Sequence, residues 1–495
     1  MTKQKETKIK KSVLINAMGK YSSVIFQLIF SVVLSRILTP AEFGVVSVIN
    51  VFVVFFELFS DLGIGTAIVQ NKELDDHDIQ GIFSFTCLLG VGLSLIFSLF
   101  SFLIANFYNN KVYINLGMLF SVSILLTSIN VVPNAILMRD KKFISVSIRT
   151  VISCVVGYAV AIALAFKGFS YYALVIRTII TVAFLLVWNL VFSKGVFRFT
   201  NDLKSIKKIW NYSAFQFGAS FLNYFQRNLD SILVGKYMGE EIQGYYNKSY
   251  TLMQYPVSYL SQVITPVLHP ILSDYQNQKN IIFKQYIKVL QLLLIIGVLV
   301  AGLFISCAEE IIYVMFGSQW SLAVEPLRII SFSIVPQMVT GTIGCIMQSM
   351  GDTKGLFKIC CVTIVISGLG ILAGIGTRTL TGLAYCIVVI YWLHLMVGAG
   401  ELLRRGMGTV MKNEHMLLWP EILMLAVMYV ASWLVYQFIS IDNLFISLVV
   451  KGVAVVIVYE ILLCTTGRYR ILKDVLGGNT WRNHYCKDIL MKKFF

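Results

Sequence analysis

Charged residues are scarce in this chain, and their scarcity excludes an ordinary soluble fold. Only 13% of the 495 residues are Asp, Glu, Lys or Arg, whereas soluble domains carry about a quarter. The chain is 57% hydrophobic and its mean hydropathy is +0.77. Most of the chain must therefore lie in an apolar environment.

Patterns that would hold a metal, a disulfide framework or a phosphate are also missing. The nine cysteines are scattered and the five histidines are isolated, so no metal-binding spacing occurs. The chain contains neither a Gly-rich phosphate loop nor a long loop. We expect no metal site and no cofactor, and we expect the cysteines to pack as small apolar side chains.

Apolar stretches of roughly 20 residues follow one another along the whole chain, and each is long enough to cross a bilayer as a helix. We predict an all-α polytopic membrane protein with about fourteen transmembrane helices of this kind. The stretches begin near Ser12, Phe43, Gln80, Val112, Val146, Tyr171, Trp210, Tyr245, Tyr286, Leu327, Phe357, Leu380, Leu417 and Asn443.

The basic residues are concentrated in alternate loops between the apolar stretches. Of the 41 Lys and Arg residues, about thirty fall in alternate connections and at the two ends, which are then cytoplasmic. The formal charge of +16 is thus a topology signal and a match to anionic inner-leaflet lipid, so nucleic acid is not expected as a partner. We predict a multi-pass protein of the bacterial cytoplasmic membrane with both termini in the cytoplasm, and an uncleaved first span. The acidic inner loop Asn71–Asp78 does not alter this orientation.

The chain repeats itself with a period near 200 residues, as many transporters do. The first and seventh spans align without a gap, with Asn16 on Gln216, Ser23 on Asn223, Gln27 on Arg227 and Gly44 on Gly244. We predict two pseudo-symmetric six-helix lobes around a central cavity. Residues 1–200 form the N-lobe, residues 201–410 form the C-lobe, and residues 411–495 add two helices and a basic cytoplasmic tail.

Four spans carry a polar stripe at helical spacing. The seventh span has Tyr212, Gln216, Ser220, Asn223, Arg227 and Asp230 within about 80° of its circumference. The first span has Asn16, Lys20, Ser23 and Gln27, the second Ser47, Asn50, Glu57 and Asp61, and the eighth Asn247, Thr251, Gln254, Ser258, Ser261 and Thr265. Because lipid contact is costly for such groups, we expect the stripes to face a water-filled cavity.

Each charge inside a span allows two interpretations. Arg227 and Asp230 form either a self-satisfying ion pair or part of a substrate or coupling site. Lys20 either reaches the interface or lines the cavity. Asp61 has either a structural or a coupling role, and Lys451 needs either a partner or an anionic lipid headgroup. The outer acids Glu240, Glu241, Glu309 and Glu310 are expected to be solvated loop charges.

Five segments carry a resemblance to a known family. They are LSRILTPAEFGVVSVINVF (Leu34–Phe52), SDLGIGTAIVQ (Ser60–Gln70), RNLDSILVGKYMG (Arg227–Gly239), MFGSQWSLAVEPLRI (Met315–Ile329) and MGDTK (Met350–Lys354). The chain resembles the Wzx-type polysaccharide flippases, in the branch of colanic-acid and teichuronic-acid exporters. These belong with lipid II flippases and multidrug antiporters in one superfamily.

The resemblance implies transport of a polyprenyl-pyrophosphate-linked oligosaccharide from the inner to the outer leaflet by alternating access. It makes Lys20, Arg177 and Arg227 the candidate cations for the pyrophosphate, and it implies a groove for the lipid tail at the last two helices. The stripes add further substrate-binding candidates: Gln27, Gln216, Asn223, Asn247 and Gln254. Glu57, Asp61 and Asp230 are candidates for coupling to a proton or Na⁺, and the membrane potential is the alternative driving force. Lys451 is a lipid-headgroup candidate. Membrane lipids, a polysaccharide polymerase and export machinery are the implied partners.

Two other functions are weighed against this one. A multidrug or metabolite antiporter shares the two-lobe plan, but it normally has twelve spans and an acidic cavity. A membrane glycosyltransferase or polysaccharide polymerase needs catalytic groups in a sizeable outer loop, and the longest outer loop here, near Glu309–Pro326, is short. We therefore expect a transporter and not an enzyme.

Overall fold

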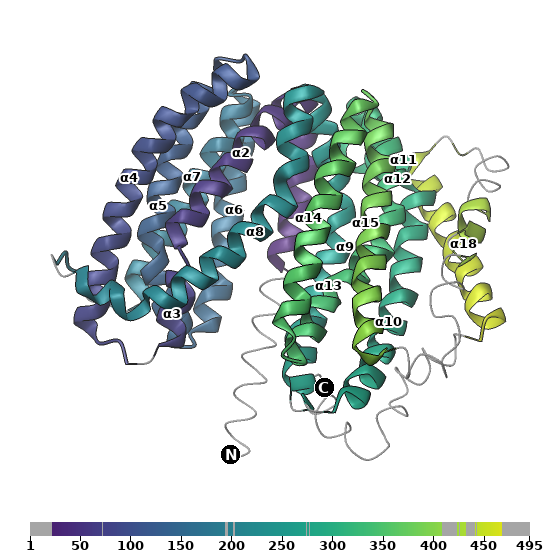
Figure 1. The fold of residues 1–495 in the computed structure, drawn as a ribbon. Helices are drawn as coiled ribbons and strands as arrows, with labels where there is room; N and C mark the ends of the chain where they lie inside the picture. Colours follow the sequence, from purple (N-terminus) through teal and green to yellow (C-terminus); the bar gives the residue numbers. More distant parts are fainter. Residues whose placement is uncertain are drawn as a thin grey trace. The chain divides into compact units, whose positions relative to one another are not determined.

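The structure is helical throughout its described part. The computed structural model (Figure 1) describes residues 22–71, 73–193, 197–200, 203–273, 275–276, 278–407, 423–424, 426–431, 441 and 443–467, and no strand occurs among them. Contacts divide the chain into two compact units, residues 1–244 and 245–495.

Unit 1 is a bundle of long helices. It contains the helix Ser22–Ile37, α2 (Pro40–Asp61), α3 (Ile64–Gln70), α4 (Asp76–Tyr108), α5 (Val112–Arg139), α6 (Phe143–Phe166), α7 (Tyr171–Phe192), η1 (Leu203–Ile206), α8 (Lys207–Tyr237) and the first turn of α9 (Glu240–Ser273). Helices α4 and α5 pack side by side, and α7 packs against both α5 and α6 (Figure 1).

Local sequence signals explain where several of these helices begin and end. Thr39 and Glu42 form a capping box around Pro40 at the start of α2, which satisfies backbone N–H groups that the helix leaves open. The acidic loop Asn71–Asp78 also caps a helix, because Asp75 and Asp78 form the capping box at the start of α4.

Unit 2 contains the remainder of α9 and a second set of helices. These are α10 (Lys279–Ser306), α11 (Ala308–Phe316), η2 (Ser318–Ala323), α12 (Val324–Ile330), η3 (Ser331–Ser333), α13 (Ile334–Ser349), α14 (Thr353–Gly376), α15 (Leu380–Leu402), η4 (Leu403–Met407) and α18 (Leu444–Thr465). Helices α14 and α15 pack side by side, as Figure 1 shows. Trp320 is fully buried where the chain departs from helical geometry between α11 and α12.

One face of helix α18 is buried against the protein, and the opposite face exposes large apolar side chains. Ser447, Lys451, Val455, Tyr459 and Leu463 are buried at every fourth position, and the Tyr459 hydroxyl donates to the Ile295 backbone oxygen at 2.5 Å. The large apolar side chains exposed on α18 also recur at every fourth position: Phe445, Val449, Val453, Ile457 and Ile461. In water such a continuous apolar stripe would be unfavourable, whereas in a bilayer it faces lipid.

The all-α polytopic membrane fold is thus confirmed. Ten helices of the described part are long and apolar enough to span a membrane, and the predicted starts at Val112, Tyr171 and Leu380 coincide with helix starts. The total of fourteen spans stays a prediction. Most of the stretch near Leu417, the predicted start at Ser12 and the basic tail after residue 467 lie outside the described residues.

Candidate functional site

A cation predicted from the sequence is held against an aromatic ring in unit 1. The Arg177 guanidinium carbon on α7 lies 4.6 Å from the ring centroid of Tyr158 on α6. Phe30 stacks on the same ring with a centroid distance of 5.4 Å. The side chain of Gln27, also from the helix Ser22–Ile37, interacts with the Tyr158 hydroxyl. Three helices therefore bring two predicted site residues, Gln27 and Arg177, to one tyrosine.

Gly157 explains why α6 and α7 approach so closely at this point. A Cβ atom on Gly157 would lie 2.2 Å from the Thr181 Oγ1 atom and 3.2 Å from the Arg177 backbone oxygen. A larger residue would push the two helices apart. The glycine thereby sets the distance between Tyr158 and Arg177.

The buried Nε of Arg177 has no hydrogen-bond partner among the described residues. Its guanidinium is held by a ring face and by neutral groups that include the Tyr158 hydroxyl, and the planar fork of donors of a guanidinium matches a phosphate. The cluster of Gln27, Tyr158 and Arg177, here named the Arg177 cluster, is thus a cationic and hydrogen-bonding site. Tyr158 was not predicted, although it stands alone as a polar aromatic residue in an otherwise apolar stretch.

The two candidate coupling carboxylates of α2 have different surroundings. The Glu57 carboxylate accepts a hydrogen bond from the Thr127 hydroxyl of α5 at 3.4 Å. Asp61 lies at the end of α2, where Leu62 and Gly63 adopt positive φ angles, and its Oδ1 accepts from the Gly65 backbone N–H at 3.1 Å. Asp61 therefore caps the first turn of α3, which supports the structural interpretation of this residue.

Helix α8 packs on α2 through aromatic side chains. Phe55 and Phe59 of α2 contact Tyr224 and Phe217 of α8 at centroid distances of 5.2 and 5.0 Å, and the Tyr224 hydroxyl donates to the Val51 backbone oxygen at 2.9 Å.

The stripe residues of α8 are only partly described. Arg227 is exposed and Asp230 is half-buried, and the Asp230 carboxylate accepts from the Ser231 backbone N–H at 2.7 Å. Gln216 and Asn223 lie in α8, but their side chains are outside the described part of the chain, as is Lys20 altogether.

In unit 2 the candidates of α9 are half-buried. Gln254 donates from Nε2 to the Ser258 hydroxyl at 3.2 Å, while its buried Oε1 has no partner among the described residues. Asn247 is half-buried, and the next residue, Lys248, lies over the rings of Phe316 and Trp320 at 4.7 and 5.4 Å.

Lys451 has the partner that the sequence requires. Its ammonium group pairs with the Glu310 carboxylate of α11, which also accepts from the Ser447 hydroxyl at 2.8 Å. The expectation that Glu310 is a solvated loop charge is wrong, because only 3% of the residue is exposed. The carboxylate is buried because it neutralises the lysine that α18 carries into the protein.

Arg149 is buried near the start of α6, where only 6% of the residue is exposed. Its guanidinium donates to the side-chain oxygens of Asn189 and Asn134. The two amides partner the terminal guanidinium nitrogens, whereas the buried Nε has no hydrogen-bond partner among the described residues.

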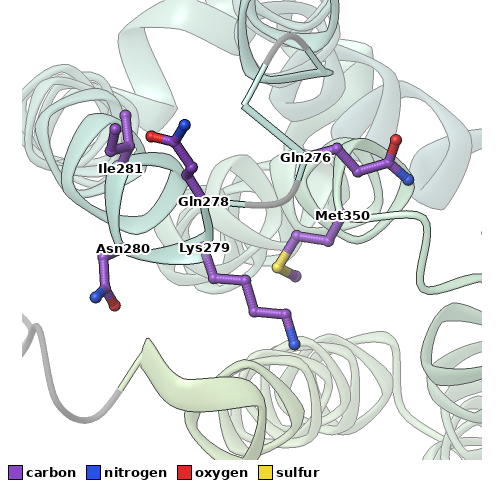
Figure 2. Close-up of a pocket in the computed structure, with 6 residues that line it drawn as sticks. All are labelled: Gln276, Gln278, Lys279, Asn280, Ile281 and Met350. Atoms are coloured by element: carbon purple, nitrogen blue, oxygen red, sulfur yellow. The ribbon is translucent and has the colours of Figure 1, made fainter.

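A pocket of about 650 Å³ lies in unit 2 beside the start of α10. Gln276, Gln278, Lys279, Asn280, Ile281 and Met350 line it. Figure 2 shows the three amide groups pointing in different directions and not toward one point. No residue predicted from the sequence as a site residue lines this pocket.

Comparisons with known proteins agree with this fold. "Teichuronic acid biosynthesis protein TuaB" of Bacillus subtilis (strain 168) is 23% identical over 377 residues, which cover 76% of this chain and 78% of TuaB. The solved structure "Lipid II flippase MurJ, inward closed conformation" is 15% identical, covers 92% of this chain and 100% of its own, and has a TM-score of 0.71. An inward-facing multidrug resistance MATE family transporter of the MOP superfamily is 15% identical, covers 79% of this chain and 96% of its own, and has a TM-score of 0.61.

The two solved structures show that the fold is that of these membrane transporters. A family match confirms the resemblance to polysaccharide flippases that the sequence motifs indicate. The family described as "Polysaccharide biosynthesis protein" matches residues 33–325, which is more than half of the 495-residue chain. The chain therefore belongs to this polysaccharide biosynthesis protein family.

Proposed function

We propose that this protein is a flippase for polyprenyl-pyrophosphate-linked oligosaccharide repeat units. It carries them from the cytoplasmic to the outer leaflet of the bacterial inner membrane, with both chain ends in the cytoplasm. Membership in a polysaccharide biosynthesis family and a fold like that of a lipid II flippase support this function. The sorting of basic residues among the loops supports the orientation.

The Arg177 cluster is the observation that carries the proposal. A charged headgroup faces a barrier on the order of tens of kcal/mol in a medium of low dielectric constant, so the protein must supply polar groups along the path. Arg177, held over Tyr158 at 4.6 Å, offers guanidinium donors to a pyrophosphate. Gln27 offers an amide to the phosphate or to the adjoining sugar.

The other predicted site residues join this path in the proposal. Lys20 and Arg227 add positive charge, while Gln216, Asn223, Asn247 and Gln254 add neutral donors and acceptors. The N-lobe (1–200) and the C-lobe (201–410) rock about the path in alternating access, and residues 411–495 receive the lipid tail. Lys451 stays a lipid-headgroup candidate, although its pairing with Glu310 already provides a counter-charge.

Coupling in this proposal uses a carboxylate or the membrane potential. Glu57 and Asp230 are the stronger carboxylate candidates, because Asp61 caps α3. The potential alone acts on an anionic headgroup with about 2.3 kcal/mol per charge per 100 mV. The protein acts as a transporter and not as an enzyme, and a polysaccharide polymerase and export machinery use its product.

The test is the accumulation of lipid-linked oligosaccharide in a strain that lacks this gene. Wild-type protein should restore polymer at the cell surface, and Arg177→Ala at equal expression should leave units in the cytoplasmic leaflet. Arg198→Ala is the matched control, because Arg198 is exposed in the connection between α7 and η1. Normal polymer in the deletion strain, together with altered drug sensitivity, would instead identify the alternative function, a two-lobe multidrug or metabolite antiporter.

A further inference from the structure

Two equivalent glycines of the internal repeat touch each other in unit 1. A Cβ atom on Gly44 of α2 would lie 1.7 Å from the Glu240 backbone oxygen and 3.1 Å from the Gly244 backbone nitrogen. A Cβ atom on Gly244 of α9 would lie 2.0 Å from the Pro40 backbone oxygen and 3.2 Å from the Gly44 nitrogen. The first turns of α2 and α9 thus meet backbone to backbone, with no room for any side chain.

Side chains on either side of this contact hold the α8–α9 turn in place. Asn110, which connects α4 to α5, donates from Nδ2 to both carboxylate oxygens of Glu240 at 2.8 and 3.0 Å. The Tyr108 hydroxyl donates to the Ile232 backbone oxygen at 3.0 Å, and Lys236 donates to the Phe107 backbone oxygen. The end of α8 and the start of α9 are therefore fastened to the α4–α5 connection.

The side chain of Gln243 is buried at this contact without a hydrogen-bond partner among the described residues, which destabilises the closed arrangement. Gln243, next to Gly244, has no exposed surface, and neither its Nε2 nor its Oε1 has a hydrogen-bond partner among the described residues. A buried amide without hydrogen-bond partners destabilises the folded protein, and hydrogen bonds to water would remove this penalty. The same contact is thus tightly packed, held at its edge by hydrogen bonds, and opposed by a buried amide that has no partner among the described residues.

We propose that Gly44, Gly244, Gln243, Asn110 and Glu240 form a seal that opens and closes during transport. It lies on the side of the membrane where α2 and α9 begin. The glycine pair lets the two helix starts close, the Glu240–Asn110 hydrogen bonds hold them closed, and hydration of Gln243 favours opening. The opposing contributions keep the free-energy difference between the two states small. The seal does not depend on which substrate is carried.

Thiol labelling of a buried reporter tests the seal. Val48→Cys, in a variant without the nine native cysteines, places a thiol at a position only 1% exposed. Val48 is covered by α8, since a Cβ on Gly235 would lie 2.6 Å from its Cγ2 atom. The measurement is the rate at which a charged, membrane-impermeant thiol reagent labels this position in whole cells and in inside-out vesicles.

The variants are expected to move the rate in opposite directions. Gly44→Ala should raise it about tenfold, because the closed state no longer fits, and Glu240→Ala should raise it by a smaller factor. Gln243→Leu should lower it below the parent rate, which a loss of folding would not do. Gly92→Ala and Gly218→Ala, whose Cβ atoms would meet nothing within 4 Å, should leave it unchanged.

Two results would overturn the seal. One is a Gly44→Ala rate equal to that of Gly92→Ala, and the other is a Gln243→Leu rate above the parent. If the expected order of variants appears only in inside-out vesicles, the seal stands, and the orientation given under the proposed function is wrong.

Discussion

At the scale of single residues, Arg177 depends on a neighbour that no sequence pattern revealed. Gln27 was predicted because polar groups within apolar stretches are unusual, and Arg177 was predicted because the family resemblance implies cations for the pyrophosphate. Tyr158 was missed because its contact with Arg177 depends on the register between α6 and α7, which Gly157 sets. Sequence spacing reports the face of one helix, but it does not report which residues of two helices meet.

Removing the ring of Tyr158 should weaken transport. A cation–π contact of this kind contributes about 0.5–2 kcal/mol, so Tyr158→Leu should lower the transport rate several-fold. Tyr158→Phe keeps the ring and should stay close to wild type. The measurement is the restoration of surface polymer at equal expression. Equal loss in both variants would show that the hydroxyl, and not the ring, is what matters.

Coupling is also decided by single residues. If Asp230 carries a proton, Asp230→Asn should flatten the dependence of transport on pH, because an amide does not titrate. Asp61→Asn is the comparison, since an asparagine side-chain oxygen still accepts from the Gly65 N–H, and its pH profile should be unchanged. A wild-type pH profile for Asp230→Asn excludes that carboxylate as the carrier.

At the scale of elements, α18 shows how a buried charge fixes the docking of a helix. The sequence indicates that Lys451 requires a partner, but it does not identify Glu310, because the two residues lie 141 positions apart. Glu310 also stands in a segment that sequence patterns assign to a solvated loop. Such a partner becomes visible only when α11 and α18 are packed together.

Breaking this pair should destabilise unit 2. Glu310→Gln leaves the Lys451 ammonium buried without its counter-charge, which typically costs about 3–5 kcal/mol. The double variant Glu310→Leu with Lys451→Met removes both charges and should recover most of that loss. Thermal unfolding in detergent measures the difference, and Glu309→Gln, a neighbouring acid of α11, is the control. Full stability of Glu310→Gln would contradict the ion pair.

At the scale of the whole molecule, hydropathy predicted the helical membrane fold well and the contacts poorly. The predicted span starts at Val112 and Leu380 coincide with helix starts, because long apolar runs have few alternatives in a bilayer. The single span predicted from Leu327 is instead part of a broken segment, from η2 at Ser318 to the end of α13 at Ser349. Pro326 and Pro336 occur there, and proline interrupts regular helix hydrogen bonding.

The internal repeat was also only partly informative. Alignment at an interval of 200 residues pairs Gly44 with Gly244, but it does not reveal that the two residues touch. Contacts divide the chain after residue 244, because α8 packs on α2 through aromatic residues that are not part of the polar stripes. The lobe boundaries at 200 and 410 stay a prediction.

The most direct measurement is flipping by the purified protein in vesicles. Lipid-linked units extracted from the deletion strain would be placed in liposomes, and the fraction accessible to an impermeant sugar-oxidising reagent would be followed. We predict that wild-type protein makes the inner-leaflet units accessible and that Arg177→Ala slows this, while Arg198→Ala does not. Accessibility equal to that of protein-free vesicles would contradict the flippase function.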